Sequence, residues 1–97
     1  MKATWNNIVI AESETVVRFK NNIFFPYDSV KLQYLVKNNQ SFSDNDKGVC
    51  QYYNVEVGGV VAKNGAWMCS NPNLEAEKIR DYFAFSKDIA ISDTSQK

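Results

Sequence analysis

The sequence contains no histidine, only two cysteines, two prolines and four glycines, and no excess of charge of either sign. Without histidine, the usual structural zinc sites and a histidine-activated serine or cysteine nucleophile are excluded. The eleven basic and eleven acidic residues are mixed along the chain, so no basic face that would neutralise a run of phosphates is expected. We therefore expect no nucleic-acid partner, no bound metal and no cofactor.

Long apolar runs are also missing. The longest are far shorter than the roughly 20 residues that a membrane-spanning helix needs. The polar pair Asn6-Asn7 interrupts the segment where a signal peptide would have its apolar core, and there is no polybasic membrane anchor. We expect a cytoplasmic protein with no membrane partner, in which Cys50 and Cys69 remain thiols used for packing.

The composition instead predicts one small domain rich in large rings. A chain of 97 residues fits a single domain, which we place at residues 1–91, followed by a frayed polar tail at 92–97. Six phenylalanines, five tyrosines and two tryptophans give much buried area per residue, which suits a small core. We expect a monomer or a weak homodimer.

In the first half of the chain, short apolar stretches separated by turn residues predict an antiparallel meander. The expected strands are 3–5, 8–12, 15–19 and 23–25, with turns at Asn6-Asn7 and Lys20-Asn21-Asn22. Pro26 ends the fourth strand because it cannot donate to a ladder, and residues 26–29 have the chemistry of one helical turn. Residues 30–36 alternate and predict a strand, and the polar residues 37–46 predict a mobile loop with at most short edge pairing around Phe42.

The central strand is expected at residues 47–57, Lys-Gly-Val-Cys-Gln-Tyr-Tyr-Asn-Val-Glu-Val. Aromatic and β-branched residues recur there at period two, as on a half-buried strand. Tyr53, Val55 and Val57 then share the core face, and Tyr52, Asn54 and Glu56 the opposite face. Gly58-Gly59 predicts a hairpin leading into 60–62 and, after a turn at 63–65, into 66–69.

Residues 72–83 predict the one helix of the chain. Pro72 fits the first helical position after an Asn71 cap, and Ile79, Tyr82 and Phe83 fall at the spacing of one apolar stripe. A closing strand at 89–91 would point both isoleucines inward. The expected fold class is mostly β (α+β): a strongly curved antiparallel sheet of short strands, with the helix at about 72–83 covering its open side.

Four motifs resemble a known family in their order and spacing. They are Phe24-Phe25-Pro26-Tyr27-Asp28-Ser29-Val30, Lys47-Gly48 followed by Tyr52-Tyr53, Ala66-Trp67, and Tyr82-Phe83-Ala84-Phe85. The family they resemble is domain of unknown function 427, small bacterial and fungal proteins sometimes labelled nucleotidyltransferase-like. The similarity runs from about Lys2 to Ile91. It implies a compact, strongly bent β fold, similar to the β-tent proteins but without their zinc, and it implies no particular activity.

The chain departs from the family pattern at two places. Members commonly carry Cys-Pro-Trp before the Lys-Gly pair, where this chain has Asp44-Asn45-Asp46. They commonly carry Tyr-Tyr-Pro after the tryptophan, where this chain has Met68-Cys69-Ser70 and delays the proline to Pro72. If the missing groups shape the family's site, this member binds something different or binds weakly.

The candidate ligand-binding residues are Lys47, Gly48, Tyr52, Trp67 and Lys31. A lysine beside a flexible glycine can hold a phosphate or carboxylate as a point charge, and the two rings can stack on a planar group. The alternative is a solvated turn lysine and a tryptophan that fills a small core. No catalytic residue is identified, although Tyr52 with Lys47 or Lys31 could serve as an acid–base pair.

Three further patterns have plainer explanations. The carboxylates Asp44, Asp46 and Glu56 could hold a divalent cation, but they lack the glycine and distal glutamate of a calcium loop, so a solvated loop is favoured. The paired carboxylates and phosphate cradle of nucleotidyl transfer are missing. The Phe24-Phe25-Pro26 element is either an exposed docking ridge or, as we favour, a strand end with one ring packed inward.

These observations leave three functional hypotheses. The leading one is a small-molecule binding module with a pocket lined by aromatic residues and lysine. The second is a metal-free enzyme that uses the lysine–tyrosine pair. The third is an interaction module that recruits a protein partner, or a second copy, through a sheet edge or the segment around Phe42.

Overall fold

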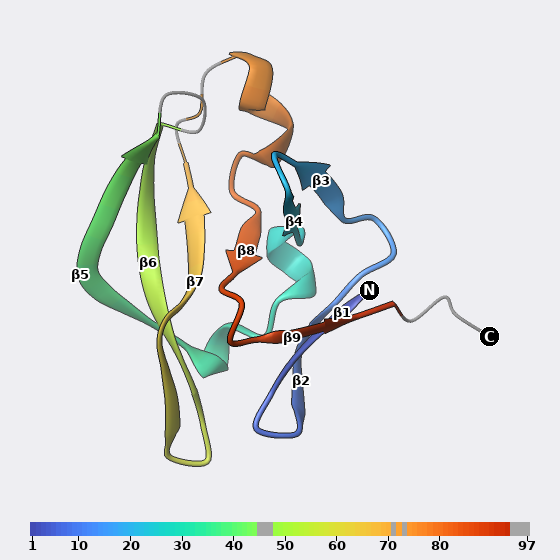
Figure 1. Ribbon diagram of the computed structural model, residues 1–97, viewed down its shortest axis with the longest axis vertical. Helices are drawn as coiled ribbons and strands as arrows, with labels where there is room; N and C mark the ends of the chain where they lie inside the picture. Colours follow the sequence, from blue (N-terminus) through green and yellow to red (C-terminus); the bar gives the residue numbers. More distant parts are fainter. Residues whose placement is uncertain (45–47, 71, 73, 94–97) are drawn as a thin grey trace.

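The computed structural model describes residues 1–44, 48–70, 72 and 74–93, and within them the chain forms nine strands and three short 3-10 helices (Figure 1). In chain order these are β1 (Lys2–Trp5), β2 (Ile8–Glu12), β3 (Val17–Phe19), β4 (Asn22–Phe24), η1 (Tyr27–Ser29), η2 (Leu32–Tyr34), β5 (Leu35–Asp44), β6 (Gly48–Val57), β7 (Val60–Cys69), η3 (Leu74–Ile79), β8 (Phe83–Phe85) and β9 (Ala90–Ser92). The mostly β fold class is confirmed. None of the helices in these ranges has the length and apolar character needed to cross a membrane.

The strands form three antiparallel sheets. The largest has the order β5-β6-β7-β8 and contains three strands of ten residues, which stand side by side on the left of Figure 1. The second sheet has the order β2-β1-β9, and β3 and β4 form a hairpin. A bridge between Phe25 and Phe83 joins this hairpin to the edge of the largest sheet, with backbone N–O distances of 2.7 and 2.9 Å.

Three hairpin turns form where the turn residues predict them, but the turn predicted at 63–65 is wrong, because β7 runs through these residues as a bulge. Both central residues of the turns at Asn6-Asn7, Lys20-Asn21 and Gly58-Gly59 have positive φ, between 50° and 82°. This conformation suits two-residue hairpins, because its twist matches that of the flanking strands. The single helical turn after Pro26 is also confirmed, as η1.

Two irregularities in strand pairing, both beside the middle of β6, bend the largest sheet. The pairing of β5 with β6 shifts between Lys37 and Ser41, and the pairing of β6 with β7 shifts between Tyr53 and Val55. Bulges of this kind bend a strand and re-aim its side chains, and β5 turns visibly along its length in Figure 1. A Cβ on Gly65 would lie 3.0 Å from the side chains of Ala62 and Val55 and from the carbonyl oxygen of Ala62, so any larger residue would crowd the bulge in β7.

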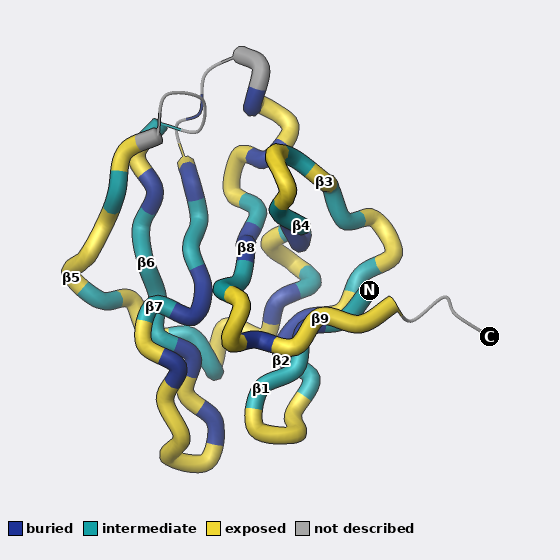
Figure 2. Tube along the Cα trace, viewed as in Figure 1, coloured by how far each residue is buried: buried dark blue, intermediate teal, exposed yellow. Residues whose placement is uncertain are grey.

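The largest sheet has a buried cluster on each face, and Figure 2 shows where the buried residues fall along the chain. The first core includes Phe25, Val55, Ala66 and Phe83, and the second core consists of Phe24, Ala76, Ile79 and Ala84. Because side chains alternate along a strand, β8 directs Phe83 to one cluster and Ala84 to the other. Phe25 and Phe24 divide in the same way, and both are fully buried. The Phe-Phe-Pro element is therefore neither an exposed ridge nor a strand end with one inward ring, because each ring fills a different core.

The predicted helix at 72–83 is wrong. The chain forms only the 3-10 helix η3, passes Asp81 at a φ of 63°, and continues as β8 from Phe83. The spacing of Ile79, Tyr82 and Phe83 imitates a helical stripe, but these residues contribute to both clusters. Pairing of Phe83 with Met68 on one side and Phe25 on the other outweighs the helical pattern. The expected Asn71 cap lies outside the described residues.

Residues 30–44 also differ from expectation, and residues 45 and 46 of the expected loop lie outside the described residues. In place of a strand at 30–36, η2 covers Leu32–Tyr34 and β5 begins only at Leu35. The expected loop is largely strand, since β5 continues to Asp44 and pairs with β6 along both sides of its bulge. The polar composition misled the prediction because β5 is an edge strand, whose side chains need not enter a core.

The end of the chain is partly as expected. β9 covers residues 90–92, so Ser92, placed by the sequence in the polar tail, pairs with Lys2. Ile89 is 3% exposed, but Ile91 is 37% exposed, so the expectation that both isoleucines point inward is wrong. The reason is that β9 is an edge strand of a small sheet. Residues 94–97 lie outside the described residues.

Candidate functional site

Tyr52 and Trp67, two of the residues predicted to bind a ligand, are direct partners on β6 and β7. Phe42 on β5 touches both, with ring centroids 5.1 Å from Tyr52 and 5.3 Å from Trp67. Phe24 meets Trp67 edge-on at 5.2 Å. We call these four residues the ring cluster. Trp67 is partly buried with phenylalanine rings on two sides, so it packs in the second core as well as facing the surface.

The other candidates are not gathered at the ring cluster. Lys47 lies outside the described residues, and Gly48 begins β6 with a φ of 76°. Lys31 is exposed, and its backbone N–H donates to the carbonyl of Ile10. Its neighbour Val30 packs in the first core, on the side of the sheet opposite Tyr52 and Trp67. Of the carboxylates weighed for a cation, Asp46 lies outside the described residues and Glu56 lies near the far end of β6.

Next to the ring cluster lies a group of side-chain amides that sequence reasoning missed. Asn38 Nδ2 donates to Asn54 Oδ1 at 2.9 Å and to Asn64 Oδ1 at 2.7 Å. Asn64 Nδ2 donates to Gln40 Oε1 at 2.9 Å. These four residues, the amide cluster, come from β5, β6 and β7 at the level of the two bulges. Asn54 follows Tyr52 by two positions on β6, so both side chains stand on the same face.

Backbone bonds fix the orientation of these amides. The backbone N–H of Gln40 donates to Asn38 Oδ1 at 2.8 Å, and that of Asn64 donates to Asn54 Oδ1 at 3.0 Å. A backbone N–H can only donate, so the side-chain atom that it meets is the oxygen. It follows that Asn38 Nδ2 is the donor to its neighbours, and the direction of every bond in the cluster is set.

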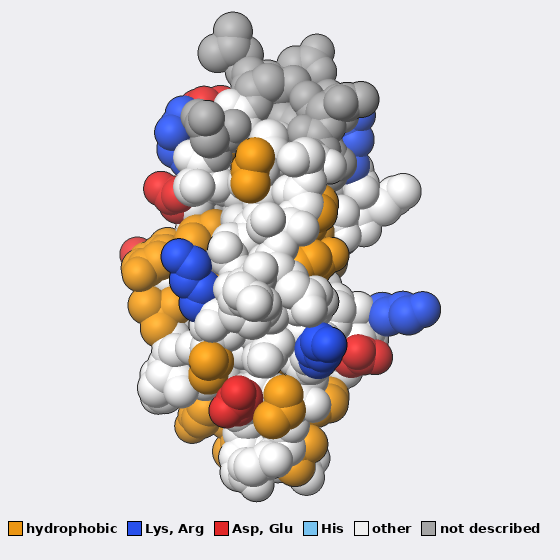
Figure 3. Space-filling model, turned by 90° about the vertical axis from the view of Figure 1, so that its left-hand side faces the viewer, with side chains coloured by type: hydrophobic (Ala, Val, Ile, Leu, Met, Phe, Trp, Pro, Cys, Tyr) orange, Lys and Arg blue, Asp and Glu red, His pale blue; other side chains and the backbone are white. Residues whose placement is uncertain are grey.

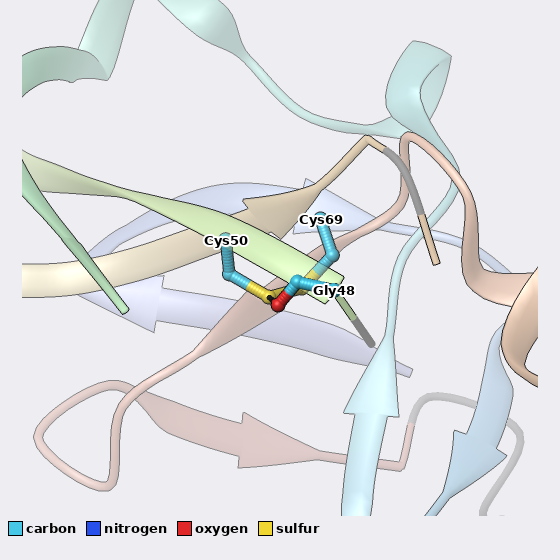
Figure 4. Close-up of a disulfide and its surroundings, with 3 residues drawn as sticks. All are labelled: Gly48, Cys50 and Cys69. Carbon is cyan, nitrogen blue, oxygen red and sulfur yellow. Dashed lines mark hydrogen bonds between the residues drawn. A yellow bond between two sulfur atoms is a disulfide. The ribbon is translucent and has the colours of Figure 1, made fainter. Parts of the chain in front are cut away.

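On the same face, Cys50 and Cys69 form a disulfide, so the expectation of two thiols is wrong (Figure 4). The two residues are direct partners on β6 and β7, with Cα atoms 4.1 Å apart. The bulge in β7 explains the error. The register at the hairpin, Val57 with Val60, would place Cys50 opposite Trp67, and the two-residue shift places it opposite Cys69. The sequence separation alone does not show this.

Three shallow hollows lie elsewhere on the described surface. One of about 240 Å³ lies between the β3–β4 turn and the β8–β9 connection, where Ile23, Phe85, Ile89 and Ile91 form an apolar lining with Lys87. The β3–β4 turn lines a second hollow of about 410 Å³, and the third, of about 280 Å³, lies near the amino terminus. None of these three is lined by Tyr52 or Trp67.

Tyr53 lies on the opposite face of β6, and the pKa of its phenol provides a test of its burial in the first core. Its ring meets Phe83 at 5.3 Å, and burial, with the nearby charge of Tyr27 as a second cause, raises the pKa of its phenol above the ordinary value of about 10. The folded state thus favours the neutral phenol. This contribution to stability is complete below about pH 10 and is lost as the pH rises through the folded pKa.

We expect Tyr53→Phe to lose less stability than the wild type as the pH rises above about 10. The measurement is the urea midpoint of unfolding at several alkaline pH values. Tyr27→Phe is the control, and it should remove only the smaller part of the loss because it removes the second cause. Parallel curves for Tyr53→Phe and wild type would contradict the assignment.

Comparison with known proteins identifies the class to which this chain belongs. Residues 1–95 match the family described as Domain of unknown function (DUF427). The match covers nearly the whole chain, and the chain belongs to this family. No curated protein matches it.

Proposed function

We propose that this chain is a small-molecule binding module whose ligand lies on the face of β6 and β7 that carries Tyr52. The observation that best supports this is that the ring cluster and the amide cluster adjoin on one sheet face. Ligand sites in proteins combine an apolar, often aromatic, surface with a few oriented polar groups. Lys47, the charge that the sequence offers for a ligand, precedes β6 and remains part of the proposal.

The two alternative functions, an interaction module and a metal-free enzyme, have weaker support. A partner added to the edge of β5 would need a regular row of free backbone groups along that edge, but a bulge interrupts β5 between Lys37 and Ser41. Irregular edges of this kind oppose strand addition. An acid–base pair of Lys31 with Tyr52 is disfavoured because the core residues beside them lie on opposite faces of the sheet.

The location of the protein is a separate question. A cytoplasmic location, expected from the sequence, stays a prediction. The disulfide between Cys50 and Cys69 bears on it, because disulfides are rare in cytosolic proteins.

Binding can be tested with Trp67 as the only indole. The sequence contains two tryptophans, and Trp5 donates one exposed bond, from Nε1 to Val60 O at 3.0 Å, so Trp5→Phe leaves Trp67 as the reporter. We expect at least one compound of a metabolite panel to raise the melting temperature and to change Trp67 emission. In this background Tyr52→Ala should lower the affinity for that compound by about tenfold, the effect of losing one stacked ring.

The control is Tyr27→Ala, a tyrosine that is half exposed on η1 and stacks with Phe83. It removes the same side chain away from the ring cluster, so affinity should not change. A panel in which no compound shifts the melting temperature, or equal weakening by both alanine variants, would contradict the proposal.

A further inference from the structure

The amide cluster ends in two free hydrogen-bond donors. Asn54 Oδ1 accepts two bonds, from Asn38 Nδ2 and the backbone N–H of Asn64, while Asn54 Nδ2 has no partner among the described residues. At the other end Gln40 Oε1 accepts from Asn64 Nδ2, and Gln40 Nε2 is likewise without a partner in the described part of the chain. Because the bonds all run in one direction, the acceptors are used inside the cluster and N–H donors are left over.

The position of Asn54 makes this leftover donor relevant to the ring cluster. Asn54 is partly buried, and it stands two residues from Tyr52, a spacing of roughly 7 Å along a strand. It also lies at the register shift between β6 and β7, and such irregularities recur next to functional sites. Figure 3, which faces the side of the molecule where β5 lies, shows a surface whose middle carries few charged side chains.

We infer that the ligand of this face is a flat ring carrying an oxygen acceptor, a carbonyl or a carboxylate, with the ring against Tyr52 and the oxygen bonded to Asn54 Nδ2. An amide nitrogen donates and never accepts, so a cationic substituent at this place would meet a donor and leave it unpaired. The inference rests on the proposed function and adds the chemical class of the ligand to it.

Asn54→Asp separates the two roles that Asn54 can have. The new carboxylate keeps an oxygen for the bonds from Asn38 Nδ2 and the backbone N–H of Asn64, so the cluster remains satisfied. What disappears is the Nδ2 donor. If Asn54 serves only the fold, binding of a neutral ligand with an oxygen acceptor is unchanged, and only charged ligands respond to the new charge. If Nδ2 holds the ligand, the variant binds ligands with an oxygen acceptor more weakly and cationic ligands more tightly.

The probes are three fragments with the same ring: benzamide, benzoate and benzylamine. Binding is followed in ¹H–¹⁵N spectra through the indole N–H of Trp67 and the side-chain NH₂ of Asn54. For the wild type we expect benzamide and benzoate to bind about tenfold more tightly than benzylamine, the effect of one hydrogen bond gained. In Asn54→Asp the order should reverse. Gln33→Glu adds the same charge on exposed η2 and should keep the wild-type order.

The outcomes distinguish a wrong ligand class from a wrong proposed function. If the Trp67 signal moves equally with all three fragments, or if Asn54→Asp binds the neutral benzamide as tightly as the wild type does, the ligand class is wrong and the binding module stands. If no fragment moves the Trp67 signal, both fail. The wild type alone tests the inference if Asn54→Asp does not fold, because equal affinity for benzamide and benzylamine, or an Asn54 NH₂ signal that benzamide does not move, would also overturn it.

Discussion

Replacing Cys50 and Cys69 together by alanine is expected to lower the free energy of unfolding by about 3 kcal/mol. The disulfide closes a loop over a sequence separation of 19, and that loop contains the β6–β7 hairpin except for the first two residues of β6. Losing it restores conformational entropy to the unfolded chain. Both cysteines are fully buried, so the double alanine variant keeps an apolar contact across the two strands.

Urea unfolding of wild type and double variant, with and without a dithiol reductant, measures this effect. The reductant should destabilise the wild type to nearly the level of the variant and leave the variant unchanged. Because the sulfur atoms are buried, reduction should be slow at low urea and fast once the hairpin opens. Equal midpoints for oxidised wild type and variant would show that the bond contributes nothing.

Phe24→Ala is expected to cost about 3–5 kcal/mol, a large part of the roughly 5–15 kcal/mol that holds a small domain together. Phe24 has no exposed surface and packs with Ala76, Ile79 and Ala84 in the second core. Its ring also meets Trp67 at 5.2 Å. Truncation therefore leaves a cavity between η3 and the sheet and removes a support of the ring cluster.

Phe42→Ala is the matched control for this variant. Phe42 touches the same indole at 5.3 Å but is only partly buried on an edge strand, so its loss should cost clearly less than that of Phe24. Denaturant unfolding compares the two free energies. If Phe42→Ala proves as costly as Phe24→Ala, the second core extends to β5, contrary to the burial seen here.

The parts of the fold that depend on local chemistry could be predicted from the sequence. Paired asparagines and glycines predicted the turns at 6–7 and 58–59 because few other residues adopt positive φ. The same chemistry at Asn64-Gly65 predicted a turn where β7 forms a bulge instead. Elements decided by distant partners could not be predicted. The run at 83–85 becomes a strand because Met68 and Phe25 pair with Phe83, and the polar run at 38–43 becomes a strand because β6 lies beside it.

In the candidate site, too, local features could be predicted and features that depend on distant partners could not. The sequence selected Tyr52 and Trp67, but it could not show that they face one another, because that depends on the two-residue shift in β7. The amide cluster was hidden for the same reason. Asn54 was assigned to the polar face of its strand, whereas Asn38 and Asn64 were placed in a loop and a turn. Only the coincidence of two bulges brings the three amides together.

The pairing of β1 with β9 has a consequence for synthesis of the protein. Lys2 lies opposite Ser92, and Ala3, which is fully buried, lies opposite Ile91. During translation β1 can pair with β2 as soon as both have left the ribosome. Its other edge stays unpaired until β9, and with it nearly all of the domain, has emerged. A nascent chain halted before residue 90 would expose that edge to other chains.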